Sequence, residues 1–261
     1  MEILKVENLS ISFGGLKAVD EVSFAVPQKS IYGLIGPNGA GKTTIFNCIS
    51  GFYKPDQGKV IFCKDDVEID LVKLKVHQII GQGLARTFQN VELFKMMTVL
   101  ENIMVGEHCN TKGNILAEGF RLPYIVKEEK RVKEKAMEII EFLGLRGLEN
   151  FPAAAQPYGT QKLIELGRAL ISRPKLLILD EPAAGMNTTE TKELAKLIKK
   201  IRDEFGITVL LVEHDMGLVM GICERICAIN FGKKIAEGTP SEIQRDKQVQ
   251  EAYLGKGEEE C

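Results

Sequence analysis

A glycine-rich segment near the start of the chain has the residue types and the spacing of a phosphate-binding loop. Residues 36–43 fit the pattern G-x-x-x-x-G-K-[ST]. Glycines in such a loop let consecutive backbone amides surround phosphate oxygens, and the positive end of the following helix faces them. We expect Lys42 to reach the β- and γ-phosphates and the Thr43 hydroxyl to ligate Mg²⁺. The expected phosphate contacts are Gly36, Pro37, Asn38, Gly39, Ala40, Gly41, Lys42, Thr43 and Thr44.

A pair of carboxylates follows an apolar run later in the chain. Residues 176–179 are all apolar, as in a buried central strand, and Asp180 and Glu181 come next. Open α/β sheets bind their ligands at the carboxyl ends of the strands. We expect Asp180 to hold Mg²⁺ through water and Glu181 to polarise a water molecule against the γ-phosphate. A lone strand with this ending would be an ordinary solvated strand end, but the phosphate loop favours the functional interpretation.

The elements around these motifs follow an α/β pattern. A short apolar run at 31–35 leads into the glycine loop, and a helix is expected from Lys42 to Ser50, which makes half of a β-α-β unit. The first thirty residues are expected to form short strands, broken at Gly14 and Gly15. Beyond residue 160 the pattern predicts a helix over 161–171, a strand over 176–179, a helix ended by Gly206, and strands over 207–212 and 226–230.

The middle of the chain has a helical character. Thr98 and Glu101 have the spacing of a capping box, so a helix should begin near Val99. Residues 109–126 are loop-like, and a charged helix is expected from Lys127 to Leu143 with a glycine after it as the C-cap. This stretch predicts a helical insertion in the α/β core.

Composition and charge exclude several classes of protein. Hydrophobic residues make up 44% and charged residues 27% of the chain, as in ordinary globular proteins. The net charge of −2 argues against a nucleic-acid binder. Apolar runs fall short of a membrane span, and the start lacks a signal-peptide pattern, so we expect a cytoplasmic protein. The six cysteines are too few and too scattered for a disulfide framework, and buried reduced thiols are expected.

The order of the motifs resembles the nucleotide-binding subunit of an ABC transporter over nearly the whole chain. Gln89 and a Tyr-Gly element lie between the phosphate loop and Asp180, and His214 follows. Within that family the chain is most similar to the ATP-binding subunit of the branched-chain (hydrophobic) amino acid importers. The segments that resemble this group are residues 86–90, 97–102, 181–187, 213–216, 238–240 and 252–255.

The resemblance implies a fold class and a domain organisation. The fold would be α/β, a P-loop NTPase (RecA-like) core with an antiparallel β subdomain and a helical insertion, of the ABC ATPase type. Residues 1–261 would form a single ABC ATPase domain. Within it, residues 1–90 and 160–255 would form the catalytic lobe, 91–159 the helical subdomain with the signature, and 256–261 a tail.

The resemblance also implies roles for single residues. Phe13 would stack on adenine, and Gln89 would contact Mg²⁺ and the γ-phosphate while joining the lobe to the helical subdomain. His214 would contact the γ-phosphate as the switch histidine of catalysis, beside Glu181. The common signature, Leu-Ser-Gly-Gly-Gln, is replaced here by residues 156–160, which carry the Tyr-Gly form of the importer group. Tyr158 and Gly159 would bind ATP through backbone amides at a helix start.

The implied cofactors are ATP and Mg²⁺, and the implied function is ATP hydrolysis that powers the import of branched-chain amino acids. Two copies, or this chain and a similar ATPase subunit, would pack head to tail. ATP would close this dimer and hydrolysis would reopen it. The partners would be membrane-spanning permease subunits and, indirectly, a solute-binding protein, with no nucleic acid. The chain would lie peripherally on the cytoplasmic face of the inner membrane.

Three alternatives stay open at this point. One is an ABC ATPase of another importer, for urea, short amides or other amino acids. Another is a soluble ABC-type module that acts on ribosomes or DNA, although such relatives generally carry two phosphate loops or a long coiled-coil insertion. A P-loop switch or small-molecule kinase is the third, and the Tyr158-Gly159 element and His214 argue against it.

Overall fold

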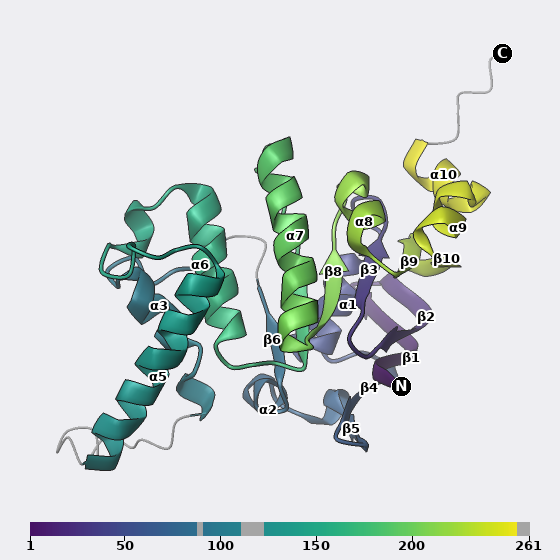
Figure 1. The fold of residues 1–261 in the computed structure, drawn as a ribbon. Coiled ribbons are helices and arrows are strands. Elements are labelled where there is room, and N and C mark those ends of the chain that lie inside the picture. Colours follow the sequence, from purple (N-terminus) through teal and green to yellow (C-terminus); the bar gives the residue numbers. More distant parts are fainter. Residues whose placement is uncertain (88–90, 111–122, 255–261) are drawn as a thin grey trace. The chain divides into compact units, whose positions relative to one another are not determined.

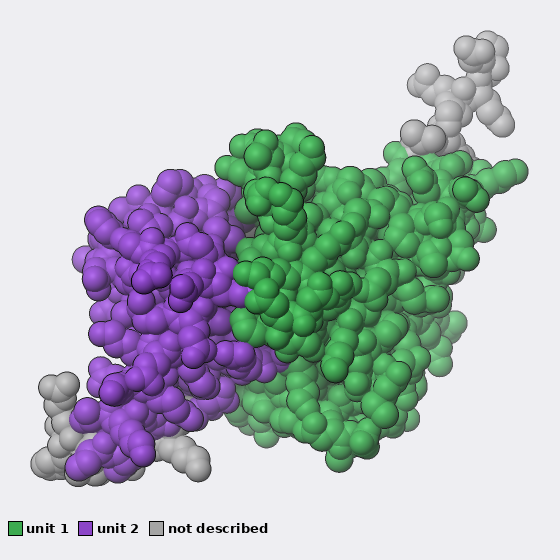
Figure 2. Space-filling view, viewed as in Figure 1, with its two compact units in different colours: residues 1–86, 175–261 green, residues 87–174 purple. Residues whose placement is uncertain are grey.

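The computed structural model describes residues 1–87, 91–110 and 123–254, and its internal contacts divide the chain into two units (Figures 1 and 2). Unit 1 comprises Met1–Arg86 and Lys175–Cys261, and unit 2 comprises Thr87–Pro174. The division expected from the sequence puts residues 160–174 in the catalytic lobe. In the structure they belong to unit 2, because helix α6 (Tyr158–Leu170) packs on α3 (Val99–Val105) and α5 (Pro123–Phe142).

The N-terminal residues of unit 1 form an antiparallel sheet. Its strands, in the order β2-β1-β4-β5, are β2 (Leu16–Pro27), β1 (Glu2–Phe13), β4 (Gln57–Lys64) and β5 (Val67–Asp70). Both β1 and β2 contain 12 residues, so the expectation of short strands is wrong. Register shifts along the β1–β2 pair break the alternation of apolar and polar residues, and one long strand therefore reads as several short ones.

The second sheet of unit 1 has six strands and carries the sequence motifs (Figure 1). In spatial order they are β10 (Lys233–Gly238), β9 (Arg225–Asn230), β3 (Ile31–Ile35), β8 (Thr208–Val212), β7 (Leu176–Asp180) and β6 (Leu84–Arg86). Neighbours are parallel except for the β9–β10 pair. Every residue of β3, β7 and β8 is buried, which explains why these strands read as continuous apolar runs.

Helices cover this sheet on both faces. The main core of unit 1 joins Tyr32 and Leu34 of β3 to the antiparallel sheet and to α1 (Lys42–Ile49). On the opposite face α8 (Met216–Ile222) lies close to β3, because a Cβ on Gly33 would stand 3.1 Å from Cys223 Sγ. The remaining helical elements of unit 1 are a 3-10 turn (Leu71–Lys73), α2 (Val76–Gly81), α7 (Thr188–Phe205), α9 (Pro240–Arg245) and α10 (Lys247–Leu254).

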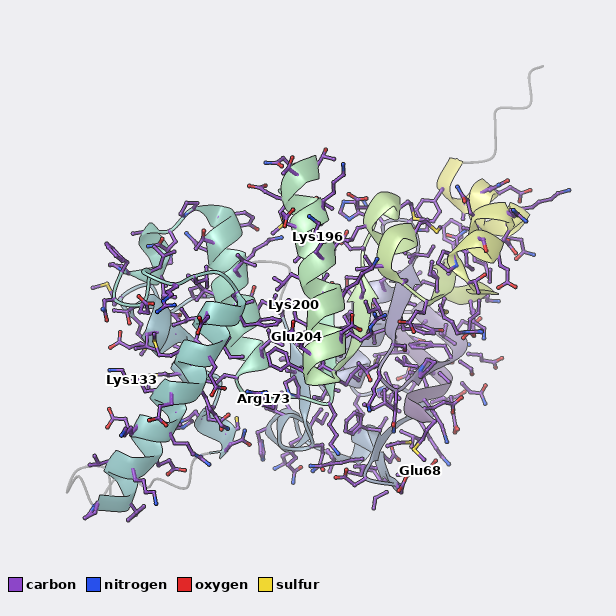
Figure 3. All side chains as sticks on the ribbon, viewed as in Figure 1. Glu68, Lys133, Arg173, Lys196, Lys200 and Glu204 are labelled. Atoms are coloured by element: carbon purple, nitrogen blue, oxygen red, sulfur yellow. The ribbon has the colours of Figure 1, made fainter. Side chains whose placement is uncertain are left out.

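Helix α7 is amphipathic, as the spacing of its apolar residues predicts. Its buried face carries Leu194, Ile198 and Ile201, and Gly206 ends it with a left-handed φ of 64°. Charged side chains, among them Lys196 and Lys200, lie on the outer face (Figure 3). The expected helix, with its glycine end, is confirmed.

Unit 2 is built from helices. The expected capping box at Thr98 and Glu101 is present and α3 begins at Val99. Helices α5 and α6 begin at Pro123 and Tyr158, earlier than expected, because their first turns contain no buried residue and so lie outside the buried apolar stripe. Short 3-10 turns lie at His108–Asn110 and Ala153–Ala155. No helix in the described part of the chain is long and apolar enough to cross a membrane.

Candidate nucleotide site

Three adjacent strands of unit 1 end at the same level of the sheet. Val212 of β8 pairs with Leu34 of β3 on one side and with Asp180 of β7 on the other. The phosphate loop follows β3, His214 follows β8, and Glu181 follows β7. The fold therefore brings three of the predicted groups to one edge of the sheet, where parallel sheets bind their ligands.

The phosphate loop is closed around the ammonium group of Lys42. Lys42 is 6% exposed, and its Nζ donates hydrogen bonds to the carbonyl oxygens of Gly36 at 2.6 Å and Pro37 at 3.0 Å. Burial lowers the pKa of Lys42, and the charges of Glu181 and Asp180 oppose this effect. The loop ends at Gly41, whose φ is 101° and whose Cβ, if present, would lie 2.6 Å from Ala18 O. Only glycine fits there.

Asp180 lies deep in the site and is paired with a residue that the sequence analysis did not single out. Its carboxylate is 2.9 Å from the Arg86 guanidinium at the end of β6. Arg86 also donates hydrogen bonds to Asn47 Oδ1 at 2.8 Å and Ser50 Oγ at 3.2 Å, at the C-terminal end of α1. Burial raises the pKa of Asp180, while the hydrogen bond and charge of Arg86 lower it. Arg86 therefore connects α1 to the strand that carries the carboxylates.

Glu181 is held in an unusual backbone conformation. Its φ is 46°, in the left-handed region that residues other than glycine rarely adopt. Two backbone hydrogen bonds hold it there: its amide donates to Val212 O at 2.9 Å, and the Ala184 amide donates to Glu181 O at 3.1 Å. Its carboxylate is 4.0 Å from Nδ1 of the exposed His214. Strain of this kind is common at functional sites, where surrounding structure fixes a side chain in place.

The residues present also fit a magnesium ion. Thr43 is exposed at the start of α1, and Asp180 supplies a carboxylate at the same edge of the sheet. Mg²⁺ prefers oxygen ligands and is usually bound through one or two carboxylates, with phosphates and waters completing the shell. The donor set therefore suits Mg²⁺ bound together with a nucleotide.

Phe13 lies at the end of β1 with a second aromatic residue beside it. The rings of Phe13 and Tyr53 meet edge to face, with centroids 5.3 Å apart, and both side chains are substantially exposed. The hairpin that carries Phe13 is hydrogen-bonded to the phosphate loop through one residue, because Gly232 accepts from Asp20 N and donates to Ala40 O. An exposed aromatic ring near a phosphate site is suited to stack on a nucleotide base.

We expect Phe13→Ala to weaken ATP binding by about 5- to 150-fold, since stacking on a base contributes about 1–3 kcal/mol. Affinity for inorganic tripolyphosphate, which has no base, should stay unchanged. Isothermal titration of both ligands measures the difference, and Leu16→Ala, at an exposed position paired with Phe13, is the control. Equal losses for the two ligands would contradict base stacking by Phe13.

The remaining predicted residues belong to other elements or lie outside the described residues. Gln89 is outside the described residues. Tyr158 and Gly159 form the first turn of α6 in unit 2, where Pro157 provides no side-chain cap. Asn187, at the end of the segment 181–187, accepts hydrogen bonds from the Thr189 and Glu190 amides and caps α7.

Several site residues could not have been found from the sequence. The hydrogen bonds of Arg86 join positions 39 and 94 residues apart, and Glu213, directly after β8, accepts a hydrogen bond from Ala183 N, 30 positions away. Tyr53 meets Phe13 only in the folded chain. A single sequence carries no local signal for such long-range pairs.

Comparison with known proteins identifies the family of the chain. A family model described as "ABC transporter" matches residues 19–184. The chain belongs to the ABC transporter family. This ABC ATPase is 44% identical to the high-affinity branched-chain amino acid transport ATP-binding protein BraF of Pseudomonas aeruginosa, over 97% of this chain and 98% of that protein. It is 42% identical to LivG of Escherichia coli, which has the same descriptive name, over the same shares.

Solved structures of ABC cassettes share the fold of this ABC ATPase. One is a nucleotide-free ATP-binding cassette from an ABC transporter, with a TM-score of 0.83 and 36% identity, covering 98% of this chain and 100% of that chain. Another is an ATP-binding cassette in its ADP conformation, with a TM-score of 0.84 and 37% identity over the same shares. The expected fold class, the family and the assignment as an ATPase are confirmed. A second family model, described as "Branched-chain amino acid ATP-binding cassette transporter", matches residues 233–259.

Proposed function

We propose that this ABC ATPase powers a membrane importer for branched-chain amino acids. The observation that supports this solute class is the match of residues 233–259 to a model of that transporter group. The similarity to BraF and LivG, 44% and 42% identity over 97% of this chain, supports the same solute class. In this proposal the chain does not contact the solute, so the solute class depends on these relatives and not on a pocket.

The residues at the sheet edge suit the chemistry of ATP hydrolysis. The loop of residues 36–44 and Lys42 bind the phosphates, and Phe13 stacks on the adenine. Glu181 accepts a proton from water as the water oxygen bonds to the γ-phosphorus. The bond from that phosphorus to the β–γ bridging oxygen then breaks, which leaves ADP and phosphate. His214 donates a hydrogen bond to the γ-phosphate. Mg²⁺, held by Thr43, Asp180 and Gln89, neutralises charge on the phosphates when bound.

The proposed assembly contains two ATPase subunits packed head to tail, either two copies of this chain or this chain and a similar one. Tyr158 and Gly159 of one subunit then contact the ATP on the partner, where the first turn of α6 supplies backbone amides. Permease subunits cross the membrane and receive the movement through unit 2. A solute-binding protein delivers the amino acid, and this chain lies on the cytoplasmic face of the inner membrane.

Uptake measurements test the solute class. In a host strain whose own branched-chain amino acid uptake ATPases are deleted, this chain is expressed together with permease and binding-protein genes from its source genome. Uptake of labelled leucine, isoleucine and valine should require the intact chain and should fail with Glu181→Gln. Labelled urea and acetamide are the comparison solutes. ATP-dependent uptake of urea or acetamide, without uptake of leucine, would assign the chain to a different importer.

A further inference from the structure

A fully buried carboxylate lies immediately before His214. Glu213 is 0% exposed, although glutamate is almost never fully buried unless its charge is compensated. Among the described residues, the hydrogen bonds of its carboxylate come from backbone amides of two separate loops. Oε1 accepts from Ala183 N at 2.7 Å, and Oε2 accepts from His214 N at 3.0 Å and Asp215 N at 3.3 Å.

The two loops held by Glu213 are those that carry the proposed reacting groups. Ala183 is two positions after Glu181, within the loop that leads from β7 to α7. His214 and Asp215 lie in the loop from β8 to α8, and Asp215 then caps α8 by accepting from Leu218 N at 3.0 Å. One carboxylate therefore connects the segment of the general base to the segment of the histidine.

The same carboxylate also faces the histidine ring. Glu213 Oε2 is 3.9 Å from His214 Nδ1, and Glu181 Oε1 is 4.0 Å from the same nitrogen. These distances are too long for hydrogen bonds, but they place both carboxylates on the Nδ1 side of the ring. A carboxylate near Nδ1 favours an orientation in which Nδ1 carries a proton and the opposite nitrogen is turned away from it.

We propose that Glu213 is a positioning residue for ATP hydrolysis, which fixes the spacing between Glu181 and His214 by hydrogen-bonding both of their loops. This inference rests on the roles of Glu181 and His214 in the proposed function. The φ of 46° at Glu181 is strained and persists only if neighbouring structure holds the backbone in place. The hydrogen bond from Ala183 N to Glu213 holds this loop two residues after Glu181, so Glu213 bridges the two loops and supports the strained conformation.

Glu213→Gln tests the bridge with a side chain of the same size. An amide has a single acceptor oxygen, so its NH₂ group must face the backbone amides of one loop, where it cannot accept a hydrogen bond. We expect kcat to fall about 10²-fold, as for a misplacement of about 1 Å. KM for ATP should stay within about threefold of wild type, because the phosphate loop is untouched.

Glu107→Gln is the matched control for stability. Glu107 is also buried, at 1% exposure, and pairs with Lys135 at 2.6 Å within unit 2. This variant should lose thermal stability and keep the wild-type kcat. If its kcat at a temperature where it is folded falls as far as that of Glu213→Gln, the loss reflects general destabilisation and the positioning role is wrong.

A double-mutant cycle separates positioning through His214 from an independent effect. If Glu213 acts through the histidine, Glu213→Gln should lower kcat little further in a His214→Ala background. Two losses that multiply, or a Glu213→Gln chain with wild-type kcat, would overturn the inference. If His214→Ala alone keeps the wild-type kcat, the role of His214 in the proposed function is wrong. The kcat of the Glu213→Gln single variant then decides whether Glu213 positions the loop of Glu181.

Glu213→Asp covers the case in which the glutamine variant does not fold. It keeps the charge but is shorter by one methylene, so it reaches one loop and not both. We expect the same fall in kcat, measured on protein whose Tm shows that it is folded. A Glu213→Asp chain with wild-type kcat and KM would show that the bridge between the loops is not needed.

Discussion

Lys42→Ala should reduce the affinity for ATP by about 10²-fold or more, because hydrogen bonds to charged groups contribute about 1.5–3 kcal/mol each and this ammonium is placed to make more than one. The reason lies in its confinement. Lys42 is buried under the loop, and its ammonium donates hydrogen bonds to the Gly36 and Pro37 carbonyls. These contacts hold the side chain in one rotamer, so little conformational entropy is lost when the ammonium binds phosphate. Its lowered pKa reflects the desolvation that such a placement requires.

The measurement is a titration of ATP and AMP against the variant. AMP lacks the β- and γ-phosphates, so its affinity should be the same in both proteins if Lys42 contacts only those groups. Lys196→Ala, on the outer face of α7, is the control for loss of a positive charge. The Lys42→Ala chain should remain folded, because the substitution removes a buried cation together with the free-energy cost of its desolvation. ATP affinity within threefold of wild type would remove Lys42 from the phosphate site.

The positions of the candidate groups at the ends of strands could be predicted further than the contacts that hold these groups in place. The phosphate loop, the carboxylates after β7 and the histidine after β8 each follow a short buried strand, and such strands are visible as continuous apolar runs. Strand order was not visible. The alignment of β3, β8 and β7 follows from the register around Val212, which depends on pairing between segments far apart in the chain.

The burial and the partners of charged residues inside the fold could not be predicted from the sequence either. Arg86 lies in a segment that resembles the importer group, but its pairing with Asp180 depends on β6 lying beside β7. Glu213 precedes the histidine in the same inconspicuous way, yet it is wholly buried and bonds to three amides. A charged residue is usually exposed, so sequence reasoning assigns it to the surface unless the structure supplies the partner.

Glu181→Gln should lower turnover by about 10²–10⁴-fold, the usual range for a positioned general base. The amide keeps the size of the side chain but cannot accept the proton of the attacking water. The strained backbone at this position is fixed by the Val212 carbonyl and the Ala184 amide, neither of which the substitution touches. Loss of turnover in this variant therefore reports on the carboxylate itself.

Asp180→Asn, one position earlier, should behave differently and serves as the comparison. Asp180 is 2.9 Å from Arg86, so the amide leaves a buried guanidinium without its charged partner and weakens the metal site as well. We expect lower stability together with weaker Mg²⁺-dependent ATP binding and turnover. In Glu181→Gln, by contrast, ATP affinity should hold or improve, since a negative charge near the γ-phosphate is removed.

The Glu181→Gln chain also tests the dimer. If ATP closes two subunits and hydrolysis separates them, a chain that binds ATP without hydrolysing it should accumulate as the closed dimer. Size-exclusion chromatography with ATP and Mg²⁺, beside a phosphate-release assay, measures both properties on one sample, and wild type with ADP is the control. Wild-type phosphate release would refute the general-base assignment. A chain that binds ATP, does not hydrolyse it and stays monomeric would agree with the general-base role of Glu181 but would refute ATP-driven pairing of the isolated subunit. With hydrolysis blocked, nothing in the proposed cycle would separate a dimer that had closed.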